Sequence, residues 1–226
     1  MLSWQTRKDA IEVIMINDCS PNTNCKYADL LEEFSDKLNI KYFENETNRG
    51  PGYCRQVGID NSSARWAMFH DDDDMLNNIY VIETLISIIE MIPEDMIITN
   101  IYSPNLIRTP ADSRFILAKR NGLGSLINLD IVKKFNVRFS ELSYEEDCLF
   151  GICYDYYCCR LRALTDKTVC ALEISDLYKD FIGYTKQTNN LSICSVLTEE
   201  KRIVEAVKYL TELLRFYYSL PADSIA

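Results

Sequence analysis

Four consecutive aspartates, Asp71–Asp74, stand one residue after a strongly apolar run that ends at Phe69. Adjacent negative charges repel one another and gain no packing energy, so a solvated acidic turn is the simplest explanation. The alternative is a metal site, because Mg²⁺ and Mn²⁺ prefer carboxylate oxygens together with the phosphates of a substrate. Two carboxylates at alternate positions, such as Asp71 and Asp73, can point at one ion.

Other acidic residues stand where they could share this chemistry. Asp18 follows the β-branched run that begins at Ile11, and Glu146 and Asp147 open an apolar helical pattern. Each also has a purely structural explanation. Asp18 suits a turn or a helix N-cap, and negative charge is favoured in the first turn of a helix. The single histidine, His70, ends a buried strand and is more typical of a packed residue than of a metal ligand.

The elements that would position these acids alternate along the chain. Short apolar runs predict buried strands and 3.6-residue periodicity predicts amphipathic helices. We expect strands at 11–18, 40–43, 65–70 and 96–102, and helices at 27–38, 55–63 and 79–91. This order predicts an α/β fold with a mainly parallel central sheet flanked by helices. Ligands of such sheets bind outside the carboxyl ends of the strands, where Asp18 and Asp71–Asp74 lie.

Composition narrows the class of protein. The chain has 34 acidic and 24 basic residues and a formal charge of −10, which argues against nucleic acid as a partner. The cluster of Cys153, Cys158 and Cys159 lacks the paired spacing of a zinc site. Without a leader or a membrane-spanning stretch, the nine cysteines indicate reduced thiols and a cytoplasmic protein. No compositional break divides the chain, so we expect one domain.

Three stretches together resemble the motifs of family 2 glycosyltransferases with the GT-A fold. They are "IEVIMINDCSPN", "NETNRGPGYCRQVGIDNSSARWAMFHDDDDML" and "LSYEEDCLF", and their order and spacing hold over roughly residues 5 to 180. The resemblance implies a single GT-A-like domain, the nucleotide-diphospho-sugar transferase fold. Residues 1–102 would form its nucleotide-sugar-binding half, 103–195 its acceptor side and 196–226 a C-terminal amphipathic helix.

The resemblance assigns a donor side to the site. Asp18 would accept a hydrogen bond from the base of the nucleotide, and Asn48 would shape the loop along which the donor approaches. Arg55 would hold the nucleotide through charge-assisted hydrogen bonds, or else it is a helix-surface arginine paired with an acid. Asp73 would contact the metal, Mn²⁺ or Mg²⁺, and Asp71 the ribose or the metal.

On the acceptor side, the resemblance makes Asp147 the general base that takes a proton from the acceptor hydroxyl, with Glu146 as the alternative base. In-line attack would invert the anomeric carbon. We therefore expect an inverting, metal-dependent glycosyltransferase of the hexosyltransferase type that moves a sugar from a nucleotide donor, a UDP-sugar first of all, to a hydroxyl acceptor. A magnesium-dependent nucleotidyltransferase also uses paired aspartates, but leaves Arg55 and Asp147 unexplained.

This sequence departs from the family pattern at three places: Asn17 replaces the usual first aspartate, Cys19 replaces the usual glycine, and the first strand is missing. The usual first strand is absent, because "MLSWQTRKDA" resembles the end of the first helix. Either residues before Met1 supply the strand, another segment fills its place, or the chain is a non-catalytic GT-A-like binding or scaffold protein.

Beyond Leu197 we expect a long amphipathic helix whose apolar face covers the core, with a homodimer or membrane-surface contact as alternatives. The residues of that face are Val204, Val207, Leu210, Leu214 and Tyr217.

Overall fold

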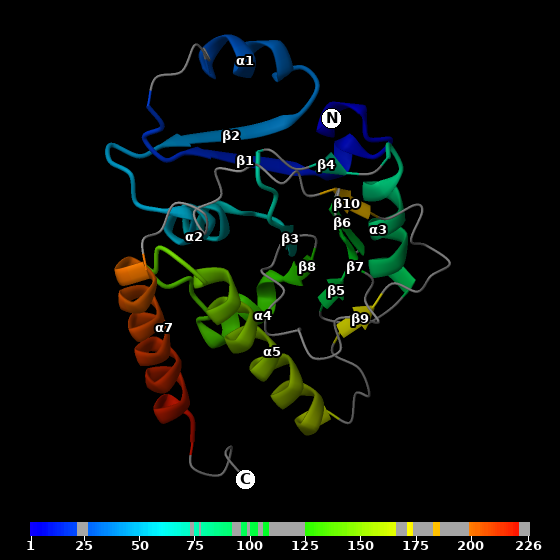
Figure 1. Ribbon diagram of the computed structural model, residues 1–226. Coiled ribbons are helices and arrows are strands. Elements are labelled where there is room, and N and C mark those ends of the chain that lie inside the picture. Colours follow the sequence, from blue (N-terminus) through cyan, green and yellow to red (C-terminus); the bar gives the residue numbers. More distant parts are fainter. Residues whose placement is uncertain are drawn as a thin grey trace.

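The computed structural model covers the whole chain and is shown in Figure 1. The residues that the structure describes are 1–21, 27–72, 75–76, 78–91, 96–98, 100–103, 106–108, 125–165, 171–173, 183–185 and 199–221. Two sequence predictions fall outside these residues wholly or largely: the metal contact of Asp73 and much of the expected acceptor side, 103–195.

Helices and short strands alternate through the described first half. The strands are β1 (Glu12–Asn17), β2 (Asn39–Glu44), β3 (Trp66–Met68), β4 (Met75–Leu76), β5 (Met96–Ile98), β6 (Asn100–Ser103), β7 (Leu106–Arg108), β8 (Ser125–Asn128), β9 (Ala171–Glu173) and β10 (Gly183–Thr185). The α-helices are α1 (Tyr27–Phe34), α2 (Pro51–Asn61), α3 (Val81–Met91), α4 (Leu129–Phe135), α5 (Glu146–Thr165) and α7 (Glu199–Ser219), and two short 3₁₀ helices, η1 (Leu2–Trp4) and η2 (Lys8–Ala10), precede β1.

A strand or helix lies at each position predicted in the first hundred residues, but several bounds differ. The helix predicted at 27–38 ends at Phe34, and the single strand predicted at 96–102 is divided between β5 and β6, which belong to different sheets. The start of helix α2 is shifted as well. Helix α2 begins at Pro51, four residues before the predicted start at Arg55. Gly50 occupies the N-cap with a φ of +84°, and Pro51 stands at the first helical position. At this position the backbone N–H has no partner within the helix, and the fixed φ of proline is already helical. The Gly-Pro-Gly sequence therefore starts this helix.

The described strands form three sheets. β1 and β2 are a parallel pair of their own, and the two four-stranded sheets have the orders β3-β8-β5-β9 and β4-β10-β6-β7. β8 runs antiparallel to both β3 and β5, so the sheets are more mixed than the mainly parallel sheet that the sequence predicts. The reason is that the alternation of strand and helix, which enforces parallel pairing, ends before β8. The α/β fold class is confirmed.

The parallel pairing of β1 with β2 places two strand ends side by side. In the register of this pair Asn17 lies opposite Glu44, and the N–H of Asn45 donates to the carbonyl of Asn17 at 2.9 Å. Because the two strands end at the same edge, the residues that follow them, Asp18 and Asn45, become neighbours.

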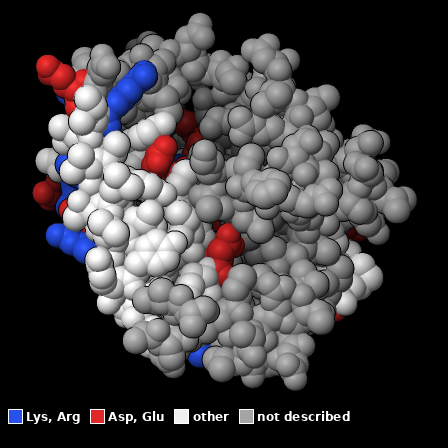
Figure 2. Space-filling model, turned by 60° about the horizontal axis from the view of Figure 1, so that its bottom comes forward, with Lys and Arg blue, Asp and Glu red and all other residues white. Residues whose placement is uncertain are grey.

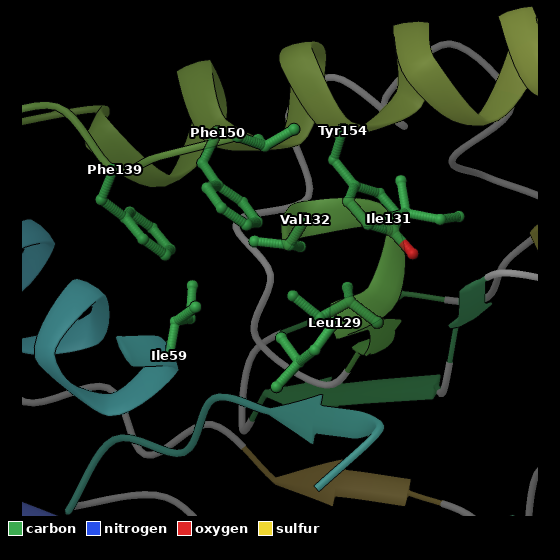
Figure 3. Packing of buried hydrophobic residues seen from close by; sticks show 9 residues of the cluster. Ile59, Leu129, Ile131, Val132, Phe139, Phe150 and Tyr154 are labelled. Carbon is green, nitrogen blue, oxygen red and sulfur yellow. The ribbon is translucent and has the colours of Figure 1, made fainter. Parts of the chain in front are cut away.

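The larger of two apolar cores lies between α2, α4 and α5 (Figure 3). The ring of Phe150 on α5 stacks on Phe139 with centroids 4.1 Å apart, and Tyr154 is fully buried. The hydroxyl of Tyr154 accepts a hydrogen bond of 2.8 Å from the backbone N–H of Asn128, at the junction of β8 and α4. This core fixes the start of α5, which carries Glu146 and Asp147, against α2.

A second core holds α3 against β8 and the N-terminal segment. Its buried members are Leu76, Val81, Ile82, Leu85, Ile88 and Leu126. Gln5, which is 2% exposed, donates to the carbonyl of Asn78 at 2.7 Å and accepts from the N–H of Ile82 at 3.2 Å. The residues before β1 are thus part of the packed fold, because this buried amide satisfies backbone groups at the start of α3.

The prediction that the apolar face of the C-terminal helix covers the core is wrong. The five residues assigned to that face are 47% to 59% exposed: Val204, Val207, Leu210, Leu214 and Tyr217. Helix α7 instead docks on α5 through Phe216, whose ring lies edge-on to Tyr156 at 5.6 Å. Periodicity correctly showed an amphipathic helix, but it does not say which of two stripes meets the core. No described helix is long and apolar enough to cross a membrane.

Charges on the molecular surface are mixed. On the face shown in Figure 2, acidic and basic side chains of the described residues lie scattered among uncharged ones, without a broad Lys/Arg patch among those residues.

Candidate active site

Asp18 anchors the loop that connects β2 to α2. Its Oδ1 accepts hydrogen bonds from the N–H of Arg49 at 2.8 Å and from Nδ2 of Asn45 at 2.7 Å, and its Oδ2 accepts from the N–H of Gly50 at 2.7 Å. Nδ2 of Asn48 donates to the Asp18 carbonyl at 3.2 Å. The predicted donor residues Asp18 and Asn48 are therefore in contact, in a loop that leads to α2.

These hydrogen bonds keep Asp18 ionised. Burial by itself would raise the pKa of this carboxyl, but the N–H groups of Arg49 and Gly50 and the amide of Asn45 together hold its pKa below the ordinary value. Asn45 is a further residue of this site that the motifs do not predict. It is a polar residue directly behind the carboxyl end of a predicted strand, and that position was the available signal.

The residue after Asp18 has an unusual backbone conformation. Cys19 has a φ of +53°, in the left-handed region that favours glycine. The family that the sequence resembles usually has glycine here, and this geometry explains why. Asn17, which stands in place of the usual first aspartate, uses its Oδ1 to accept the N–H of Ser20 at 3.0 Å. The turn thus keeps a side-chain acceptor despite the substitution.

Arg55 lies at the centre of the acidic residues. Its Nη1 donates to Oε1 of Glu146 at 2.5 Å and its Nη2 to Oδ1 of Asp71 at 3.3 Å. Arg55 is paired with acids, as the alternative hypothesis expected, but its side chain is only 13% exposed and so lies mostly inside the protein. Burial would lower the pKa of Arg55, but the nearby carboxylates of Glu146, Asp71 and Asp147 raise it.

The start of α5 brings two acids into the same cluster. Glu146 and Asp147 are 5% and 9% exposed, and Oδ1 of Asp147 accepts the N–H of Cys148 at 2.7 Å. Burial and the adjacent Asp147 raise the pKa of Glu146, against the opposing effect of Arg55. The residue before them, Glu145, has a φ of +60°, which turns the chain sharply into the helix.

Helix α2 approaches this turn as closely as a glycine allows. A Cβ added to Gly52 would lie 2.6 Å from the carbonyl oxygen of Ser140 and 2.9 Å from Cγ of Glu146. Gly52 lies one helical turn before Arg55, so its missing side chain lets Arg55 reach Glu146. The need for glycine at position 52 cannot be predicted from local sequence, because it depends on Ser140, almost ninety residues away.

Of the four consecutive aspartates, the structure describes the first two. Asp71 contacts Arg55, and its side chain is 35% exposed; Asp72 is exposed. Among the described residues no group of three or more His, Cys, Asp or Glu side chains is placed to hold a metal ion. The acids that do converge offer carboxylate oxygens, which are the ligands that Mg²⁺ and Mn²⁺ prefer. His70, which precedes Asp71 in the sequence, is half-buried.

Known sequences resemble the part of the chain that carries these residues. The family described as glycosyl transferase family 2 matches residues 3–154. TarS of Staphylococcus aureus, a poly(ribitol-phosphate) beta-N-acetylglucosaminyltransferase, is 34% identical over 71 residues, which are 31% of this chain and 12% of TarS. An uncharacterized glycosyltransferase of Haemophilus influenzae is 24% identical over 225 residues, 93% of this chain and 69% of that protein.

Solved structures show the same fold. The 1–349 fragment of S. aureus TarS in complex with UDP-GlcNAc aligns with a TM-score of 0.66 at 20% identity, over 90% of this chain and 58% of that one. A mannosyltransferase of Pyrobaculum calidifontis with GDP-Man and Mn²⁺ aligns with a TM-score of 0.61 at 10% identity, over 95% of this chain and 58% of that one. The chain thus spans little more than half of these solved relatives, and it belongs to glycosyl transferase family 2 with the GT-A fold.

Proposed function

We propose that this protein is an inverting, metal-dependent glycosyltransferase that moves a sugar from a UDP-activated donor to a hydroxyl acceptor. Membership of glycosyl transferase family 2 supports the reaction class. The likeness to TarS, which was solved with UDP and with UDP-GlcNAc, supports a UDP-sugar as the first donor to test. The TarS reaction, transfer of N-acetylglucosamine to poly(ribitol-phosphate), suggests a polyol or glycan acceptor.

The observation that carries the proposal is the convergence of acids from two parts of the chain on Arg55. Asp71 follows β3 on the donor side, and Glu146 with Asp147 opens α5 on the other side. A sugar between the two groups would have the leaving diphosphate near Asp71 and the acceptor hydroxyl near Asp147. Asp147 then takes the hydroxyl proton as the oxygen attacks the anomeric carbon, which inverts the configuration.

Asp71 and Asp73 are the residues that would hold the metal ion. When bound, a divalent cation supplies Lewis-acid stabilisation of the charge that develops on the departing diphosphate. The loop that Asp18 anchors supports a nucleotide site at the ends of β1 and β2, because ligands of α/β sheets bind at carboxyl ends of strands. Asp18 would shape this site through the loop, because its carboxylate accepts the backbone N–H groups of Arg49 and Gly50.

Donor turnover tests the proposal. A panel of UDP- and GDP-sugars is incubated with the protein and Mn²⁺, Mg²⁺ or EDTA, and release of nucleoside diphosphate is measured with water or simple polyols as acceptors. We expect release from at least one UDP-sugar, its loss with EDTA, and a loss of at least about 100-fold with Asp147→Asn, since general bases contribute about 10²–10⁴-fold. NMR of the product should show the inverted anomer.

The matched control is Arg138→Met. Arg138 pairs with Asp60 at 2.9 Å on a surface pocket of about 220 Å³ that no predicted site residue lines. This exchange removes a charged side chain close to α2 without touching the acidic cluster, so turnover should remain. Turnover that persists fully in Asp147→Asn contradicts the assignment of the base, and turnover that is equal in EDTA contradicts the metal dependence.

A non-catalytic nucleotide-sugar-binding protein is the second candidate. One observation favours this candidate: among the described strands, β1 and β2 form a sheet separate from the others. The residues that follow these two strands would then be held less rigidly, and catalysis needs side chains that are held rigidly. Calorimetry distinguishes the two candidates: a donor that binds but is neither hydrolysed nor transferred under any metal condition supports the binding protein.

A further inference from the structure

Arg55 joins acids that lie far apart in the sequence. It stands 91 residues before Glu146 and 16 before Asp71, and it donates to both. The Arg55 and Glu146 side chains are 13% and 6% exposed, while that of Asp71 is 35% exposed at the rim. One guanidinium therefore sets the separation between the acid that follows β3 and the acid that opens α5.

The charge balance makes this link strong. Three carboxylates, those of Asp71, Glu146 and Asp147, act on the one guanidinium. Carboxylates gathered around one group repel one another, and a buried carboxylate without a partner destabilises the folded state. Arg55 offsets this repulsion, and without it the first turn of α5 would be driven away from Asp71.

The surroundings hold Arg55 in one orientation. Its guanidinium carbon lies 5.9 Å from the centre of the Phe139 ring, and the N–H of Phe139 donates to Oε1 of Gln56, the residue next to Arg55, at 3.0 Å. The close contact of Gly52 with Ser140 fixes the start of the same helix. Helix α2 and the 139–146 segment thus form one packed unit around the ion pair.

We propose that Arg55 and Glu146 are a positioning pair: they fix Asp147 opposite Asp71, Glu146 takes no proton from the acceptor, and Arg55 is not a main ligand of the nucleotide. This rests on the proposed glycosyl transfer. It departs from the roles expected from the sequence, in which Arg55 binds the donor and Glu146 is the alternative base. The reason is that Nη1 and Nη2 of Arg55 and Oε1 of Glu146 are engaged with one another and with Asp71.

A double-mutant cycle tests the pair. kcat and KM are measured for wild type, Arg55→Met, Glu146→Gln and the double variant, with the sugar nucleotide that gives turnover. Arg55→Met leaves Glu146 as a buried carboxylate without its partner, and Glu146→Gln leaves Arg55 with one carboxylate fewer, whereas the double variant lacks both charges. We expect kcat to fall in both single variants. The kcat of the double variant, as a fraction of wild type, should be about tenfold or more above the product of the two single-variant fractions, since contacting residues are energetically coupled.

Binding of the corresponding nucleoside diphosphate, measured by calorimetry, separates positioning from ligand contact. A positioning role predicts a dissociation constant within about threefold of wild type in Arg55→Met, while kcat falls. Arg55→Lys keeps the charge without the planar fork and should recover part of kcat. It also serves if Arg55→Met fails to fold. Arg138→Met, combined with each variant, is the control and should give additive effects.

Three outcomes overturn the proposal while wild type remains active. The first is a double variant whose loss of kcat equals the product of the two single losses. The second is a loss of nucleotide affinity in Arg55→Met as large as its loss of kcat/KM. The third is complete inactivity of Glu146→Gln that adding Arg55→Met does not relieve, which would make Glu146 the base. Absence of turnover in wild type overturns the proposed function instead, and the positioning role falls with it.

Discussion

Oδ2 of Asp18 accepts the backbone N–H of Gly50 at 2.7 Å, so the residue behind β1 holds the residue that caps α2. Gly50 has a φ of +84° and starts the helix that carries Gly52 and Arg55. This hydrogen bond connects the end of β1 to the start of α2, the helix that carries the central arginine of the acidic cluster.

Replacing Asp18 with Asn should loosen this connection. An amide offers one acceptor oxygen where the carboxylate offers two, and its NH₂ group cannot accept the N–H of Gly50. Because hydrogen bonds to charged groups contribute about 1.5–3 kcal/mol, we expect the free energy of unfolding to drop by about that amount. Urea unfolding at pH 7 measures it. Asp36→Asn, at an exposed turn, is the control; an equal effect of both substitutions contradicts the anchoring role.

Gly52→Ala tests the close approach of α2 to the 140–146 segment. The new Cβ would lie 2.6 Å from a backbone oxygen that cannot move aside cheaply, so we expect a loss of about 1–3 kcal/mol in the free energy of unfolding. Gly58→Ala on the same helix is the matched control. Its nearest neighbour would be Cδ1 of Ile16 at 3.7 Å, so it should be neutral or stabilising by up to about 1 kcal/mol. Thermal unfolding of both variants compares them, and similar shifts would refute the steric argument.

Cys19→Gly should stabilise the protein. The left-handed backbone at φ +53° costs a residue with a Cβ about 1–2 kcal/mol, and glycine avoids this cost but loses part of the gain to the entropy of the unfolded chain. We expect a net gain of up to about 1 kcal/mol in urea unfolding. Cys19→Ala removes the thiol but keeps the Cβ, and it should give no gain. If alanine stabilises as much as glycine, the backbone is not the cause.

Stability should depend on pH through Glu12. Burial would raise the pKa of this carboxyl, but hydrogen bonds from Lys41 and Ser63 lower its pKa from 4.5 to about 2. A pKa that is lower in the folded state means that the stabilisation is present above pH 4.5 and is lost as the pH falls towards 2. The carboxylate lies 2.5 Å from Nζ of Lys41, which links β1 to β2.

Urea unfolding of wild type and Glu12→Gln between pH 7 and pH 2.5 measures this contribution. We expect the variant to be less stable at pH 7 by about 1–3 kcal/mol and the difference to shrink at the acid end of the range. Glu33→Gln is the control, because it removes an exposed carboxylate that pairs loosely with Lys37 at 3.9 Å on α1. A difference between wild type and Glu12→Gln that stays constant over the whole range would disprove the linkage.

The sequence by itself determined the order of strands and helices in the first hundred residues, because periodicity of apolar residues reflects which face of each element is buried. It also identified Asp18 and Asp71 behind strand ends, where ligands of α/β sheets bind. The motifs alone indicated the family, because they keep its order and spacing.

Only the tertiary structure decided which side chains meet. The ion pair of Arg55 with Glu146, the need for glycine at position 52 and the antiparallel insertion of β8 each depend on segments distant in the chain. The exposed stripe of α7 is a further case, since an amphipathic pattern shows a face but not its partner. Local propensity acts within a few residues, whereas pairing across 91 residues is set by how whole elements pack.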